Sequence, residues 1–194
     1  MGFTLEDGTG QGYRVKISAE NQMHVQAENH ELQHHISILH GQVYQAIGTH
    51  TLTTSGAKTI LHLKNDDPER MMVVSYMRLQ FPGGDGTIDN DTYFQLGYGT
   101  TYSAGGAGVT PINMNSSSGN LATITAYHDN PTVTGSLDVF DHWYADNGMM
   151  TFNKHGSIVM GLGDTLEFRL QTDQSTGLVY VRCTFMMYER DAIG

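Results

Sequence analysis

The sequence predicts an all-β protein, an antiparallel β-sandwich or jelly roll preceded by an extended N-terminal arm. The chain of 194 residues is 39% hydrophobic but only 15% charged, and it contains 23 glycines. This composition is typical of many short strands joined by glycine-rich turns, and a helical bundle would be richer in charged residues. From Thr49 onward, apolar and polar residues alternate with the period of half-buried strands. Strand candidates recur at intervals of ~8–12 residues, as they do in sandwiches.

The first part of the chain differs from the rest. Residues 1–48 show only patchy alternation and hold four of the seven glutamates. They also hold five histidines, namely His24, His30, His34, His35 and His40. A chain of this length accommodates one domain with an arm, but not two ordinary domains. We therefore assign residues 1–48 to an arm or small subdomain and residues 49–194 to the sandwich.

The strands of the sandwich follow from alternation and from turn residues between them. We expect strands at 51–54, 60–64, 71–81, 92–98, 121–127, 133–140, 149–152, 157–162, 165–170 and 178–188, with a turn at 65–68 and a loose stretch at 99–119. The last two strands form the clearest hairpin, with Leu166, Phe168 and Leu170 on one face. In the returning strand Cys183 shares a face with valines and a phenylalanine, so we expect it to be buried.

The net charge, the apolar runs and the cysteine count of the chain argue against several classes of partner and cellular location. The chain has 10 Lys plus Arg against 20 Asp plus Glu, a formal net charge of −10, which disfavours a nucleic-acid partner. No apolar run approaches a membrane span, and the first residues lack the features of a signal peptide. A single cysteine cannot form an internal disulfide, which fits a reducing compartment.

Residues 30–34 read His-Glu-Leu-Gln-His and match a zinc-peptidase signature, with His40 at the position of a third ligand. In such a site His30, His34 and His40 would bind zinc, and Glu31 would act as general base. However, Ser37 replaces the glycine of the extended motif, and only 29 residues precede His30. We interpret the histidines as part of an arm or subunit interface and predict no catalytic residue, no metal and no cofactor. A non-catalytic metal site and a zinc-dependent peptidase are the alternatives.

Two further segments concentrate polar or aromatic residues. Residues 82–91 contain Gly and Asp in a pattern that partly resembles a calcium loop, but the spacing fails and we interpret it as a solvated hairpin loop. Residues 138–147 hold the only tryptophan, followed by Tyr144 and flanked by acids. We expect Trp143 and Tyr144 to anchor a loop onto the sandwich or onto a neighbouring subunit. Stacking on a sugar, with paired carboxylates nearby, is the alternative.

Part of the sequence resembles a known group of proteins. Residues 50–54 read His-Thr-Leu-Thr-Thr, residues 60–67 read Ile-Leu-His-Leu-Lys-Asn-Asp-Asp, residues 72–74 read Met-Val-Val, and residues 163–170 close the pattern. Together with a Gly-x-x-Tyr element at 41–44, this resembles small structural proteins of tailed bacteriophage virions, the jelly-roll head-decoration or cement type. The resemblance covers residues 35–80 and, more loosely, the C-terminal hairpin, and it includes no catalytic motif.

The resemblance implies a non-enzymatic protein on the outside of a capsid. It would act as a homotrimer, bind the major capsid protein or another virion protein, and stabilise the head. It would be found in the virion after assembly in the host cytoplasm. We expect contacts from Tyr13, Val15, Tyr44, Trp143 and Tyr144. A carbohydrate- or receptor-binding sandwich of a tail or head fibre is the remaining alternative.

Overall fold

The computed structural model describes residues 41–81, 92–144 and 148–189. Within these ranges the chain forms strands and turns but no helix, so the prediction of an all-β protein is confirmed. It follows that the described ranges contain no helix long and apolar enough to cross a membrane. The N-terminal segment, with Tyr13, Val15, Glu31 and the predicted histidine ligands, lies outside the described residues, as does the loop at 82–91.

The strands alternate with short turns along the chain. In order they are β1 (Val43–Leu52), β2 (Gly56–Asn65), β3 (Arg70–Phe81), β4 (Tyr93–Tyr98), β5 (Thr101–Ala104), β6 (Ala107–Gly108), β7 (Ile112–Asn113), β8 (Ile124–His128), β9 (Thr132–Thr134), β10 (Asp138–Tyr144), β11 (Gly148–Met160), β12 (Thr165–Thr172) and β13 (Gly177–Glu189). Strand β1 therefore includes residues 43–48, which the sequence analysis assigned to the arm.

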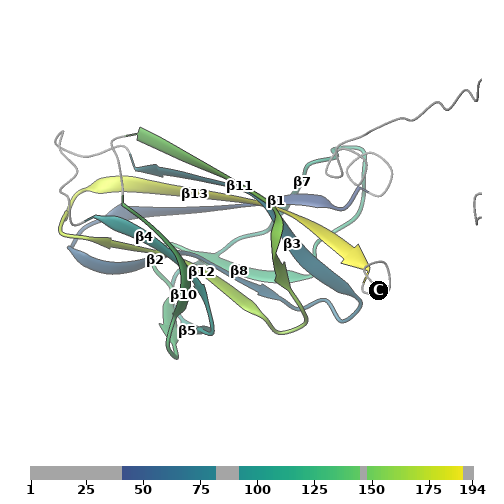
Figure 1. The fold of residues 1–194 in the computed structure, drawn as a ribbon, viewed down its shortest axis with the longest axis horizontal. Helices are drawn as coiled ribbons and strands as arrows, with labels where there is room; N and C mark the ends of the chain where they lie inside the picture. The colour runs from purple at the N-terminus through teal and green to yellow at the C-terminus, as the bar shows by residue number, and fades with distance from the viewer. Residues whose placement is uncertain (1–40, 82–91, 145–147, 190–194) are drawn as a thin grey trace, which may run out of the picture. The chain divides into compact units, whose positions relative to one another are not determined.

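The strands form two main antiparallel sheets that pack face to face (Figure 1). Sheet I has five strands in the order β11-β3-β13-β1-β7, and sheet II has six in the order β10-β4-β12-β2-β8-β6. A two-stranded sheet, β5-β9, is inserted between β4 and β10 in the sequence. Strands β1 to β4 alternate between the sheets, and so do β10 to β13, so each of the turns near 53–55 and 66–69 carries the chain from one layer to the other.

The core lies between the two sheets and follows the alternation of the sequence. Leu166, Phe168 and Leu170 of β12 are buried, as the pattern of the C-terminal hairpin predicts. Cys183 on β13 belongs to the same cluster, so its predicted burial is confirmed, and this burial raises the pKa of its thiol. Apolar side chains from both sheets make this one continuous cluster, and apolar burial on this scale is the main force that holds a sandwich together.

Three strand predictions are wrong for local reasons. The strand predicted at 51–54 is only the end of β1, which stops at Leu52, and residues 53–54 lie in a turn. Residues 133–140 do not form one strand, because Gly135 adopts a left-handed conformation with a φ of 90° and separates β9 from β10. Residues 149–152 and 157–162 are not two strands, because β11 runs continuously from 148 to 160. An irregularity between Asn153 and Ile158 shifts its register against β3. Bulges of this kind break the period of two that sequence analysis relies on.

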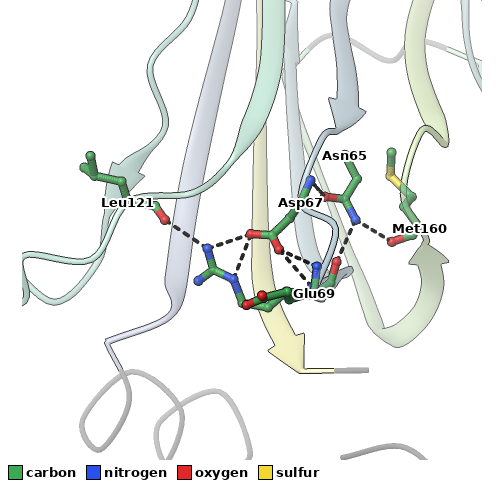
Figure 2. A network of polar contacts seen from close by, with 6 residues as sticks. Asn65, Asp67, Glu69, Leu121 and Met160 are labelled. Atoms are coloured by element: carbon green, nitrogen blue, oxygen red, sulfur yellow. Dashed lines mark hydrogen bonds and ion pairs between the residues drawn. The ribbon is translucent and has the colours of Figure 1, made fainter. Parts of the chain in front are cut away.

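The turn between β2 and β3 is fixed by a network of polar contacts (Figure 2). The Asn65 side chain donates to the carbonyl oxygens of Arg70 and Met160, each at 3.0 Å. Asp67 accepts from the backbone amides of Glu69 and Arg70 at 3.0 and 2.9 Å. The guanidinium group of Arg70 pairs with the Asp67 carboxylate and reaches the carbonyl of Leu121. The network thus joins this turn to β11 and to the segment before β8.

Candidate functional site

The side of the sandwich formed by β10 and β11 is the strongest candidate for a functional surface. These strands end the order of sheet II and sheet I respectively, so each has one unpaired edge among the described strands. Lys154 on β11 forms an ion pair with Asp141 on β10. Beside it, the rings of Trp143 and Phe152 stack with their centroids 4.3 Å apart. These contacts join the two strands across the sheets, and we call the resulting surface the β10–β11 edge.

Apolar side chains are exposed along the β10–β11 edge. Tyr144 is 68% exposed and Phe140 is 44% exposed, and Val139 and Val159 are exposed to a similar extent as Phe140. Natural edge strands are commonly protected by lysine or proline, and β10 contains neither, although it carries two aspartates and a bulge between Val139 and Asp141. An open strand edge that also presents apolar surface is typical of a site where another protein binds.

An aromatic cluster lies on the outer face of the same edge. The rings of Tyr93 and His142 are 4.4 Å apart between centroids, and those of His142 and Tyr144 are 5.3 Å apart. Tyr93 and Tyr144 meet edge to face at 6.2 Å. Tyr144 and His142 are both exposed, so this cluster presents ring surface to solvent. Such surfaces stack against apolar or sugar-like partners and also serve as anchors in protein interfaces.

A pocket of about 390 Å³ opens at the start of β10, at the opposite end of the β4–β10 pair from the aromatic cluster. Tyr98, Thr100, Asp138, Val159 and Asp164 are among the residues that line it. Burial raises the pKa of the Tyr98 phenol, and the charge of Asp164 raises it further. In the described ranges no group of three or more His, Cys, Asp or Glu side chains lies close enough to hold a metal ion. The pocket therefore offers two carboxylates and hydroxyl groups as its polar chemistry.

A buried polar layer lies on the outer face of sheet II near this pocket, and the sequence did not reveal it. Glu167 is fully buried and accepts hydrogen bonds from Thr59 and Arg169, both at 2.8 Å. Opposite it in register, His62 donates from Nε2 to the carbonyl of Thr100 at 3.2 Å. Burial lowers the pKa of the His62 imidazole, so the neutral ring is the form that the fold favours.

The buried His62 predicts a specific loss of stability in acid. Its ordinary pKa is 6.5 and its folded-state pKa is lower, so below pH 6.5 the unfolded chain binds a proton that the folded protein does not. The free energy of unfolding should therefore fall as the pH drops below 6.5, with a slope of up to about 1.4 kcal/mol per pH unit from this group. Denaturant titrations between pH 7.5 and 5 should show a shallower dependence for His62→Gln. The matched variant His142→Gln, at an exposed histidine, should keep the wild-type slope, and equal slopes in all three proteins would contradict this role.

The structure places the predicted interface residues in three different settings. Tyr44 is fully buried in the core, where its ring stacks on Phe185 at 5.8 Å. Trp143 and Tyr144 are not in a loop, as the sequence analysis expected, but in strand β10. Trp143 faces inward and is partly buried against the core, whereas Tyr144 is exposed. The alternating strand separates the two aromatic residues, and only Tyr144 is available to a partner.

Comparisons with known proteins do not assign the chain to a family. No protein-family model matches the chain. A search of curated proteins also found no match.

Proposed function

We propose that this protein is a non-enzymatic structural protein of a bacteriophage virion, a capsid decoration or cement protein that acts as a homotrimer. The proposal rests chiefly on one observation, the exposed apolar side chains along the open β10–β11 edge. Such a protein works through contact area with its neighbours rather than through a catalytic group. The β10–β11 edge is the surface that we assign to those contacts.

The chemistry of this edge suits assembly. Tyr144 and Phe140 are large side chains that lose apolar surface to solvent when a partner covers them, at about 25 cal/mol per Å². Aromatic residues are enriched at the centres of protein interfaces and often dominate their binding energy. A closed ring of subunits also covers strand edges that an isolated sandwich leaves open.

The order of the long strands supports the jelly-roll part of the proposal. The strands β1-β13-β3-β11 are adjacent in sheet I, and β2-β12-β4-β10 are adjacent in sheet II. The first long strand therefore pairs with the last, and the second pairs with the next to last. This nested order is what two successive Greek keys produce in an eight-stranded jelly roll. It agrees with the sequence resemblance to jelly-roll decoration proteins.

The proposal is tested by binding to heads of a tailed phage that encodes this chain, prepared from a strain that lacks the gene. Wild-type protein should sediment with these heads at saturable stoichiometry. Phe140→Asp should bind at least about tenfold more weakly, because the interface would then bury an unpaired charge. Leu121→Asp is the matched control, since Leu121 is exposed but lies outside the β10–β11 edge. Wild-type protein that does not bind would refute the decoration role, and equal binding by both variants would refute the assigned surface.

The aromatic cluster favours carbohydrate binding as a second candidate function. His142 and Tyr144 present exposed rings on the outer face of β10. The pocket with Asp138 and Asp164 lies at the other end of the same strand. Rings stack on sugar faces while carboxylates accept hydrogen bonds from sugar hydroxyls. A glycan array followed by titration of any ligand found would test this function, with Tyr144→Ala as the variant that should lose binding. The inward-facing Trp143 is the less informative position, because its substitution would also disturb the contact with Phe152.

A further inference from the structure

Two arginines lie directly opposite each other on the outer face of sheet I. Arg182 of β13 and Arg78 of β3 are partners in the strand register. Val181 and Cys183 flank Arg182, and Met77 and Leu79 flank Arg78. All four belong to the core, so the arginines point away from it. Side chains that face each other in an antiparallel pair have Cβ atoms about 5 Å apart, and like charges in this position destabilise the sheet. The juxtaposition therefore calls for a negatively charged partner.

Within the described part of the chain, neither arginine has an acidic partner. The other basic residues in the described ranges all have partners. Lys58 donates a hydrogen bond to Thr54, and the remaining four form the ion pairs Lys64–Asp66, Arg70–Asp67, Lys154–Asp141 and Arg169–Glu167. The Nε atom of Arg78 is buried and has no hydrogen-bond partner among the described residues. The chain has twice as many acidic as basic residues, yet none of the described acids pairs with either arginine.

The arginines share a pocket with two neutral polar side chains. The pocket has a volume of about 320 Å³ and is lined by Arg78, Gln80, Tyr180 and Arg182. Gln80 and Tyr180 are also partners in the register of β3 and β13. Each lies two residues from an arginine along its strand, so the two pairs share one face of the sheet. The set supplies two guanidinium groups, an amide and a phenol, all of which donate hydrogen bonds. Guanidinium groups bind carboxylate and phosphate oxygens in pairs, with charge-assisted hydrogen bonds.

We propose that Arg78, Arg182, Gln80 and Tyr180 form a binding site for an oxyanion, either a carboxylate or a small inorganic anion such as phosphate. The bound group would accept hydrogen bonds from both guanidinium groups and remove their mutual repulsion. A nucleic-acid backbone is not the expected source, because the net charge of the chain repels polyanions. The site lies on the outer face of sheet I and is independent of the assembly proposed for the β10–β11 edge.

Thermal unfolding of the full chain in low-salt chloride buffer tests this site. Phosphate and glutarate are titrated separately at constant ionic strength, because the first represents an inorganic anion and the second a carboxylate side chain. In at least one of the two titrations, the melting temperature of the wild type should rise with anion concentration and then level off as the site fills. Arg182→Gln should bind that anion at least about tenfold more weakly, since it loses charge-assisted hydrogen bonds, and should melt no lower than the wild type without anion.

The control variant is Lys58→Gln, which removes a positive charge at a half-buried position outside the pocket. It should respond to the anion as the wild type does, which separates the site from general effects of salts on stability. A response to phosphate alone would identify an inorganic anion as the ligand, and a response to glutarate would identify a carboxylate. The proposal is overturned if neither anion gives a saturable response, or if Arg182→Gln responds like the wild type.

Discussion

Replacing Asp67 with alanine is expected to lower the free energy of unfolding by about 3 kcal/mol, in the range found when one partner of a buried ion pair is removed. The Asp67 carboxylate is almost fully buried and accepts hydrogen bonds from two backbone amides and from Arg70. Alanine would leave these amides unsatisfied and the guanidinium group without its counter-charge. Urea titration at pH 7 measures this loss, which is centred on the turn between β2 and β3.

The exposed Asp173 provides a matched control for this variant. It lies in the turn between β12 and β13, and Asp173→Ala should change stability by less than about 0.5 kcal/mol, as is usual for surface positions. Burial alone would raise the pKa of Asp67, but the hydrogen bonds from Arg70 and the backbone outweigh this effect and lower it. The contribution of Asp67 should therefore be present near neutral pH and disappear as the pH falls below its ordinary value of 3.8. An Asp67→Ala protein as stable as the wild type at pH 7 would contradict the importance of the network.

Replacing Phe168 with alanine is expected to cost about 4 kcal/mol of unfolding free energy, within the range for phenylalanine in a packed core. Phe168 is 1% exposed and lies on β12, which pairs with β2 on one side and with β4 on the other. The substitution removes apolar contacts and leaves a cavity that neighbouring strands of a paired sheet cannot easily close. Denaturant unfolding followed by the intrinsic fluorescence of Trp143 measures the change.

Phe140→Ala is the matched control for the core variant, because it removes the same atoms from a side chain that is 44% exposed. At concentrations where the protein does not associate, it should cost about half as much as Phe168→Ala or less, since much of the Phe140 ring is already exposed and its removal leaves no enclosed cavity. If the two phenylalanine variants lost equal stability, the division between the core and the β10–β11 edge would be wrong.

The sequence was most informative where the alternation is regular and the turns contain glycine or aspartate. The C-terminal hairpin is the clearest case, because Leu166, Phe168 and Leu170 all face the core as the pattern predicts. Cys183 was likewise placed correctly from its neighbours on β13. In these strands burial depends on one face of one sheet, so a local pattern contains the necessary information.

The sequence was less informative where distant segments decide the environment. Glu167 occupies a polar position of β12, yet it is fully buried, and Thr59 and Arg169 donate hydrogen bonds to its carboxylate. The candidate surface was found only in part: Trp143 and Tyr144 were singled out, but their opposite orientations follow from strand β10. The pairing of Arg78 with Arg182 depends on a register between residues about a hundred positions apart, and no local pattern contains that information.

The central claim is that the chain functions through association at the β10–β11 edge, and native mass spectrometry of the untagged full chain tests it most directly. The wild type at micromolar concentration should appear as a trimer, and Phe140→Asp should shift the population to monomer while Leu121→Asp should not. The same spectra would reveal any metal retained by the histidine-rich segment. A wild-type chain that remains monomeric at every concentration, or a Phe140→Asp variant that keeps the wild-type oligomer, would contradict the claim.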